Sequence, residues 1–312
     1  MDGFADNQMR RMSSSEHLWG IILAGGEGKR LQDFILKRYG IERPKQYSAI
    51  VGKRSMLRHT LDRVEKIIPA KQLQIVVNRK HRNYVQEEIK ERERKSILVA
   101  PENRESAASV YLALSHIYFR DPEAVVAIFP SDHFIGEEDR FMSYVEHAIS
   151  FVGKHPDFVV LLGIKPTDTN LQYGWIEPSK NFLLHEGNRF YKVVRFCEKP
   201  KIKEAQEFFN AGSLWNSLVL AAKCETLVKM YRMHLEVIYD AFKKAKSVYG
   251  TDEEEQFIVD AFNNFPSKNF SKCVLEVIPE SLFVLRVEGV LWSDWGNKEQ
   301  VLKDLDSLGV AH

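Results

Sequence analysis

Residues 19–31 read WGIILAGGEGKRL, a short apolar run that ends in a glycine-rich turn. An uninterrupted apolar run of this length is typical of a strand that is buried on both faces of a parallel sheet. Similar runs recur at residues 74–77, 96–99, 124–129 and 158–163, with stretches of helical period between them at 55–68, 84–94, 105–119 and 141–153. Strands that alternate with helices of this length predict βαβ units, and therefore a Rossmann-like, doubly wound α/β fold with a mostly parallel sheet.

The pattern becomes less regular after about residue 165. Extended segments are expected at 173–177, 189–198 and 282–287, and helices at 201–210, 225–233 and 253–262. We expect one domain over residues 18–312, with a regular half at about 18–165 and a smaller α+β half at about 166–312. Residues 1–17 are polar and are expected to form a flexible lead-in.

The charge balance excludes one broad class of function. The chain has 312 residues, with 44 Lys and Arg against 43 Asp and Glu, which gives a formal net charge of +1. A protein that coats nucleic acid normally carries a clear basic excess, so we expect no nucleic-acid partner. The three cysteines form no CxxC pair, and no apolar stretch is long enough for a signal peptide or a membrane span. These features predict a cytoplasmic protein without a membrane partner.

The glycine-rich turn after the first strand is a candidate anion site. Gly25, Gly26 and Gly28 allow a sharp turn with exposed backbone N–H groups, and Lys29 and Arg30 add positive charge. The spacing excludes both a P-loop and the dinucleotide fingerprint, which argues against a nicotinamide-dependent oxidoreductase. From the residues alone, a phosphate-binding loop and an ordinary strand-to-helix turn both remain open.

Two further positions in the first half carry charge where a ligand would be expected. Lys45 follows Pro44, whose fixed backbone would aim the ammonium from a defined loop. Asp132 follows the strand that ends at residue 129, at the carboxyl edge where open α/β sheets bind ligands. Asp132 is therefore either a metal ligand or catalytic carboxylate, or a cap of the next helix.

The second half combines aromatic and polar residues in four short segments. They lie at residues 173–177, 198–200, 215–217 and 292–296, the last of which contains Asp294 between two tryptophans. Aromatic rings next to Asn, Glu and Gly suit a sugar, whose faces are apolar and whose hydroxyls need donors and acceptors. Each segment is also compatible with an ordinary core tryptophan or turn.

Taken in order, these motifs resemble those of the sugar-1-phosphate nucleotidyltransferase family. The matching segments are LAGGEGKRL (23–31), PKQ (44–46), PENRES (101–106), FPSDH (129–133), YGWIEP (173–178), CEKP (197–200), WNS (215–217) and WSDWG (292–296). Within that family the chain is most similar to the mannose-1-phosphate guanylyltransferases, in a short form without the C-terminal isomerase domain. The resemblance implies transfer of a nucleoside monophosphate from GTP to mannose 1-phosphate, with release of pyrophosphate.

The resemblance also implies roles for individual residues. It assigns nucleotide contacts to Leu23, Ala24, Gly25, Gly26, Gly28, Arg30, Lys45, Asn103, Ser106 and Ser131. It assigns sugar contacts to Tyr173, Gly174, Glu198, Lys199 and Asn216, and the cofactor Mg²⁺ to Asp132 and Asp294. Arg30, Lys45 and Lys199 would neutralise phosphate charge during the reaction, which is mainly a matter of positioning and electrostatics.

Some positions depart from the family pattern, so alternatives stay open. Glu105, Ser106, Ala108 and Leu218 stand where the family has other residues. The same reaction with a heptose or glucose phosphate, or with another nucleotide, is therefore the nearest alternative. A non-catalytic regulator that binds a nucleotide sugar is a different class, and a homodimer is an open expectation.

Overall fold

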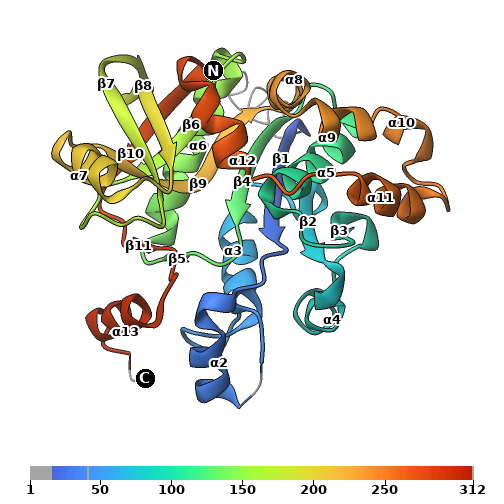
Figure 1. Ribbon diagram of the computed structural model, residues 1–312, viewed down its shortest axis with the longest axis horizontal. Helices are drawn as coiled ribbons and strands as arrows, with labels where there is room; N and C mark the ends of the chain where they lie inside the picture. Colours follow the sequence, from blue (N-terminus) through green and yellow to red (C-terminus); the bar gives the residue numbers. More distant parts are fainter. Residues whose placement is uncertain (1–15, 41, 311–312) are drawn as a thin grey trace, which may run out of the picture.

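The computed structural model describes residues 16–40 and 42–310, so most of the expected lead-in lies outside the described residues. The centre of the molecule is a nine-stranded sheet with the order β3-β2-β1-β4-β9-β6-β10-β8-β7 (Figure 1). Its strands are β1 (Leu18–Ala24), β2 (Leu73–Asn78), β3 (Ile97–Ala100), β4 (Val125–Pro130), β6 (Val159–Ile164), β7 (Gly174–His185), β8 (Asn188–Glu198), β9 (Leu214–Lys223) and β10 (Leu282–Val287). A separate pair is formed by β5 (Phe134–Ile135) and β11 (Trp292–Ser293).

The strand directions confirm a mostly parallel, doubly wound sheet. β1 pairs in parallel with β2 and β4, and β6 pairs in parallel with β10. Only β8 and β9 run against the others, because β9 is antiparallel to both β4 and β6, and β8 is antiparallel to β10 and β7. The carboxyl ends of β1, β2 and β4 consequently meet at one edge of the sheet.

Most of the helices form two layers that cover the faces of the sheet. The helices are α2 (Gln32–Tyr39), α3 (Met56–Val64), α4 (Arg82–Ile89), α5 (Glu105–Arg120), α6 (Glu138–Lys154), α7 (Ile202–Asn210), α8 (Cys224–His234), α9 (Glu236–Ala241), α10 (Ala245–Val248), α11 (Glu254–Asn263), α12 (Phe270–Cys273) and α13 (Lys298–Ser307). In β1, Ile21 belongs to the core under α5 and α8, whereas Ile22 belongs to the core under α3 and α6. Because alternate side chains of each strand enter opposite cores, both faces of the sheet are buried. This explains why the strand sequences are continuously apolar.

A third, smaller core lies outside the sheet. It joins α2, which follows the glycine-rich turn, to the C-terminal helix α13 through Leu31, Ile35, Trp295, Val301 and Leu305. Figure 1 shows both helices at the bottom of the view, at the same end of the molecule. Segments from the two ends of the chain are therefore packed together beside the carboxyl edge of the sheet.

The sequence analysis did not predict one central strand, β9, and predicted a second strand, β7, to be shorter than it is. β9 was not predicted, although it lies between β4 and β6, because Asn216 and Ser217 interrupt its apolar pattern and form a register shift against β6. β7 continues to His185, well beyond the expected residue 177, as one arm of a hairpin with β8. Strands from both expected halves thus share a single sheet.

No helix in the part of the chain that the structure describes is both long and apolar enough to cross a membrane.

Close packing at the centre of the sheet makes Gly163 in β6 sensitive to substitution. A Cβ atom there would lie 2.7 Å from both Leu214 Cδ1 and Val284 Cγ2. We expect Gly163→Ala to lower the free energy of unfolding by about 1–3 kcal/mol, the usual cost of overpacking a core. Gly153 in α6 is the matched control, since an added Cβ meets nothing within 4 Å. Equal stabilities of the two variants in urea unfolding would contradict this packing argument.

Candidate functional site

A cavity of about 410 Å³ lies at the carboxyl ends of β1, β2 and β4. Its wall includes Gly25 and Gly26 from the glycine-rich turn, Asn78 from the end of β2, and Asp132 after β4. The opposite wall comes from the second half of the chain and includes Asp294. Ligand sites in open α/β sheets occur at this edge, and the volume is in the range of small-molecule sites.

The glycine-rich turn is held by the short 3₁₀ turn Lys45–Tyr47. The buried Gln46 donates from Nε2 to the carbonyl oxygens of Ala24 at 3.0 Å and Gly26 at 2.7 Å, and the Tyr47 hydroxyl donates to Ala24 O at 3.1 Å. Because a trans peptide directs its C=O and N–H in opposite directions, the N–H groups of the same two peptides point away from this turn. Gly28 has φ +62°, and a Cβ on it would lie 2.9 Å from Lys45 N, so this position requires glycine.

Lys45 connects the two aspartates of the site. Its side chain is only 5% exposed, and Nζ lies 2.8 Å from Asp132 Oδ2 and 2.5 Å from the backbone oxygen of Asp294. Burial opposes the ionisation of Asp132, but the charge and hydrogen bond of Lys45 together with the nearby His133 and Arg30 outweigh it, so the pKa of Asp132 lies below its usual value. A carboxylate from β4 and a backbone group near the C-terminus therefore meet at one ammonium.

Asp294 is fixed on several sides. Its Oδ1 accepts hydrogen bonds from the Tyr173 hydroxyl at 2.7 Å and from Gly296 N at 2.8 Å, and Arg30 Nη2 lies 3.4 Å from Oδ2. The next residue, Trp295, is fully buried, and its Nε1 donates to Asp304 of α13 at 2.9 Å. The packing of α13 against α2 thus sets the position of Asp294.

Asp132 and Asp294 could hold a magnesium ion whose remaining ligands are substrate oxygens and water. Within residues 16–40 and 42–310, no group of three or more His, Cys, Asp or Glu side chains could hold a metal alone. Asp132 and Asp294 nevertheless face the same cavity. Mg²⁺ prefers oxygen ligands and is commonly bound by one or two carboxylates together with phosphates and water. The two aspartates suit that mode of binding rather than a preformed cage.

The second-half wall is built around Gly174 at the start of β7. A Cβ there would lie 2.7 Å from Glu198 Oε2 and 3.2 Å from Asn216 Cβ, so glycine leaves room for both side chains. Asn216 Oδ1 accepts from Leu218 N at 3.1 Å, which fixes the amide at the bulge of β9. Gly174, Glu198 and Asn216 all line the cavity.

Glu198 and His133, which also line the cavity, have shifted pKa values. Burial raises the pKa of Glu198 to about 7, and the nearby carboxylates of Glu276 and Glu105 add to the shift while Lys199 opposes it. Burial also lowers the pKa of His133 to about 4, so His133 is neutral at pH 7. Glu198 consequently changes charge near neutral pH, which allows it to donate or accept hydrogen bonds there.

Backbone strain is concentrated at this cavity. Among the described residues, the non-glycine residues with positive φ are Glu105 (58°), Glu186 (49°), Lys199 (53°), Leu218 (57°) and Trp295 (44°). Glu105, Lys199 and Leu218 line the cavity, and Trp295 follows Asp294. Such conformations cost about 1–3 kcal/mol each and persist where the surrounding structure enforces them, commonly at functional sites.

One buried donor in the cavity has no partner among the described residues. The indole Nε1 of Trp292 is closed to solvent and makes no hydrogen bond, and the same holds for His133 Nδ1, whose tautomer decides whether it donates or accepts. The two rings contact each other edge-to-face with centroids 5.2 Å apart. Unsatisfied buried polar atoms are uncommon in folded proteins, so these two mark the lining of the cavity as unusual.

Most residues expected from the sequence are brought together. The cavity is lined by Leu23, Gly25, Gly26, Arg30, Asn103, Ser106, Ser131, Asp132, Tyr173, Gly174, Glu198, Lys199, Asn216 and Asp294. Ala24, Gly28 and Lys45 do not line it but hold the groups that do, through the contacts described above. Ser131 also joins the end of β4 to β1, since its N and Oγ both donate to Leu23 O, at 3.1 and 2.8 Å.

Several lining residues were missed. Gln46, Asn78, Gln172, Asn269 and Ser271 also face the cavity. Asn78 ends β2, so the rule that found Asp132 would have found it. The sequence around Asn269 and Ser271 does not indicate a site. Backbone hydrogen bonds between Lys268 and the start of α5 bring these residues to the cavity.

The chain belongs to the nucleotidyl transferase family, whose model matches residues 19–307. It is 29% identical over 281 residues to the alginate biosynthesis protein AlgA of Pseudomonas putida, which covers 88% of this chain and 56% of the relative. It is 28% identical over 301 residues to a mannose-1-phosphate guanylyltransferase of Salmonella montevideo, which covers 93% of this chain and 60% of the relative. The chain thus spans little more than half the length of these relatives.

Solved structures agree on the fold. A crystal structure described as mannose-1-phosphate geranyltransferase from Thermus thermophilus matches with a TM-score of 0.76 and 24% identity, over 92% of this chain and 79% of that one. A structure described as mannose-6-phosphate isomerase from Helicobacter pylori matches with a TM-score of 0.68 and 20% identity, over 89% of this chain and 99% of that one. At this identity the likeness concerns the arrangement of strands and helices.

The raised pKa of Glu198 predicts a pH-dependent stability. Between the ordinary value of 4.5 and about 7, the folded protein binds more protons at Glu198 than the unfolded chain does. Stability therefore falls as pH rises through this window, by about 3 kcal/mol. We expect urea unfolding at pH 5 and pH 8 to show a smaller loss for Glu198→Gln than for the wild type. The exposed Glu207→Gln is the control, and an equal loss in all three proteins would refute the assignment.

Proposed function

We propose that this chain transfers a nucleoside monophosphate from GTP to mannose 1-phosphate, giving GDP-mannose and pyrophosphate, with Mg²⁺ as cofactor. The names of its relatives support the substrate pair, since one of them is a mannose-1-phosphate guanylyltransferase. The observation that carries the proposal is the meeting of both halves of the chain at Lys45. Its buried ammonium lies between the carboxylate of Asp132 and the backbone oxygen of Asp294, two residues that line the cavity. A cytoplasmic location is part of the proposal.

The first-half wall suits the nucleotide. Gly25 and Gly26 let a triphosphate approach the backbone closely, and Arg30 adds a flexible positive charge, since its side chain is 57% exposed. Asn103, Ser106 and Ser131 lie further along the same wall. We assign the triphosphate to the glycine-rich turn and the nucleoside to the side of Asn103 and Ser106.

The second-half wall suits the sugar phosphate. Glu198 and Asn216 present polar atoms around the space left by Gly174, where sugar hydroxyls would bind. Lys199 follows Glu198 on the same wall and is the cation available for the sugar phosphate.

The reaction needs two anionic reactants to be held in line. An oxygen of the sugar phosphate forms a bond to the α-phosphorus of the nucleotide as the bond between that phosphorus and the bridging oxygen breaks, so pyrophosphate leaves with the electron pair. We assign to Lys45 the stabilisation of negative charge that develops at the α-phosphate, and its contacts with Asp132 and Asp294, which both line the cavity, support this role. Asp132 and Asp294 would hold Mg²⁺, which would neutralise charge and orient the two reactants.

Substrate choice is tested most directly with a panel of reactants. The purified protein, Mg²⁺ and each of four nucleoside triphosphates are combined with mannose, glucose and heptose 1-phosphates, and pyrophosphate release is measured. We expect release to be fastest with GTP and mannose 1-phosphate. Release only with UTP or dTTP would overturn the guanine assignment, and release with no pair would favour the alternative of a non-catalytic nucleotide-sugar-binding regulator.

The metal-site assignment predicts large effects from small substitutions. Asp132→Asn and Asp294→Asn should each lower kcat by about 10²–10³-fold, because each removes a charge from the transition-state environment. Asp157→Asn, on the surface between α6 and β6, changes the same charge away from the cavity and should keep full turnover. Circular dichroism checks that each variant is folded. Full activity of Asp132→Asn or Asp294→Asn would remove that residue from the metal site.

A further inference from the structure

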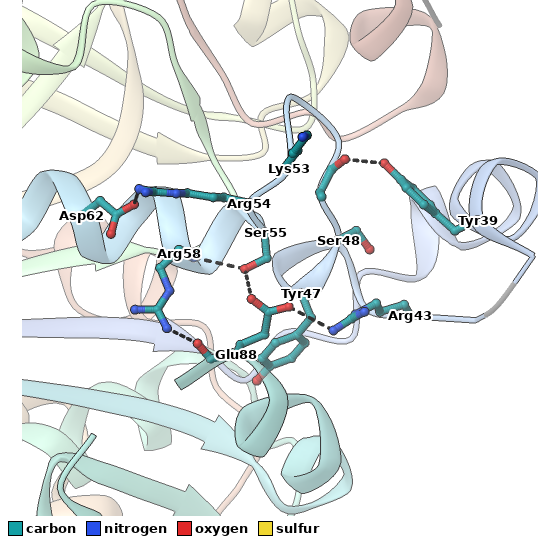
Figure 2. Close-up of a pocket in the computed structure, with 11 residues that line it drawn as sticks. Tyr39, Arg43, Tyr47, Ser48, Lys53, Arg54, Ser55, Arg58, Asp62 and Glu88 are labelled. Carbon is teal, nitrogen blue, oxygen red and sulfur yellow. Dashed lines mark hydrogen bonds and ion pairs between the residues drawn. The ribbon is translucent and has the colours of Figure 1, made fainter. Parts of the chain in front are cut away.

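A second cavity lies on the other side of the turn Lys45–Tyr47 from the first cavity. It has a volume of about 560 Å³, and its wall includes Tyr47 and Ser48, whereas Gln46 of the same segment faces the first cavity. The two cavities share no lining residue. Figure 2 shows this second cavity between the loop that carries Lys53, the start of α3 and the side chain of Glu88 from α4. The turn Lys45–Tyr47 is therefore a wall between two separate spaces.

Positive side chains dominate the second cavity. Four cations line it, Arg43, Lys53, Arg54 and Arg58, against the two carboxylates of Asp62 and Glu88. The carboxylates are already engaged. Arg54 pairs with Asp62, and Glu88 accepts from Arg43 at 3.0 Å and from the Ser55 hydroxyl at 2.6 Å. The remaining charge that faces the space is positive.

Lys53 supplies the clearest unmatched charge. No hydrogen bond or ion pair holds its ammonium in the part of the chain that the structure describes, and Figure 2 shows it on the loop at the rim, away from the dashed contacts. Arg43 and Arg58 also pair with Glu87 and Glu91, but these two carboxylates do not line the cavity and are 61% and 52% exposed. Ion pairs this exposed are weak and exchange readily for a better anion.

The cavity is directly connected to the catalytic lysine. Arg43 lies on its wall, and Lys45, two residues further on, contacts both aspartates of the first cavity. Ser48 N donates to Lys45 O, and Met56 N at the start of α3 donates to Ser48 O, at 3.0 and 3.2 Å. An anion that draws Arg43 away from Glu88 would therefore act on the segment that positions Lys45.

We propose that this second cavity binds a phosphate-bearing small molecule and that its occupancy is coupled to the catalytic cavity through the turn Lys45–Tyr47. Arginine and lysine side chains are the usual protein partners of phosphate, and the cavity volume matches that of sites for nucleotide-sized ligands. The binding site stands on its own geometry, and only the catalytic consequence rests on the proposed function. The ligand is recognised by its phosphate, which can come from free inorganic phosphate or from a phosphomonoester.

Binding is tested by isothermal titration at low ionic strength with two probes, inorganic phosphate and GMP. The test variant is Lys53→Gln/Arg54→Gln, and its matched control is Lys180→Gln/Lys203→Gln, which removes the same charge from exposed positions on the other half of the chain. We expect the test variant to bind one phosphate fewer per chain than the wild type, or to bind it at least 10-fold more weakly, while the control is unchanged. Thermal unfolding checks that both variants are folded.

The two probes distinguish the source of the phosphate. A loss with both probes assigns the site to the phosphate group in either form, and a loss with one probe assigns it to that form. Unchanged binding of both probes by the test variant would overturn the proposal, and so would an equal loss in the control, because the effect would then reflect net charge alone.

Coupling is measured by titrating GTP with Mg²⁺ into the wild type and into Lys53→Gln/Arg54→Gln, each with and without inorganic phosphate. We expect phosphate to change the affinity of the catalytic cavity for GTP by about 5-fold or more in the wild type but not in the variant, since coupled sites influence each other reciprocally, whereas direct competition at the catalytic cavity would affect both proteins equally. An unchanged affinity would overturn the coupling. If the protein does not bind GTP at all, the first titration still decides whether the second cavity is a phosphate site, so the two failures are distinguishable.

Discussion

The arrangement of this molecule depends on one buried ammonium. Lys45 lies between Asp132, which follows β4, and the backbone of Asp294, which precedes the last helix. A buried charge is stable only when its surroundings satisfy it, so removing either partner would leave an expensive unpaired group. The requirement explains why both ends of the chain converge here. The glycine-rich turn must be close enough for Gln46 to hold it, and α13 must anchor Trp295 so that Asp294 reaches Lys45.

The strain around the cavity fits the same picture. Lys199 and Leu218 hold unfavourable backbone conformations on the wall of the cavity that comes from the second half of the chain, and Trp295 does so beside Asp294. None of these residues is a glycine, so the surrounding packing must supply the energy that each conformation costs. The cores beneath the sheet and around α13 are the source of that energy. Rigid packing outside the cavity thereby permits irregular backbone inside it.

Sequence reasoning succeeded where local pattern and global fold agree. The apolar run of β1, the turn at Gly25–Gly28 and the aspartate after β4 are local signals, and all three lie where they were expected. It failed where long-range contacts decide. β9 has an apolar pattern broken by Asn216 and Ser217, and its place between β4 and β6 cannot be seen from neighbouring residues. Lys53 and Arg54 also resemble ordinary surface residues in the sequence, and only the fold places them beside Arg43 around a cavity.

The insertion of β9 has a consequence for how the chain acquires its structure. During synthesis, β4 and β6 emerge before the strand that separates them in the sheet, so the two cannot pair in their final arrangement until residues 214–223 have left the ribosome. Until then each presents an unpaired edge of apolar strand, the kind of surface that promotes aggregation. Contacts between residues so far apart in sequence also slow folding. The centre of the sheet is therefore among the last parts to close, and a truncated chain that ends before β9 would expose it permanently.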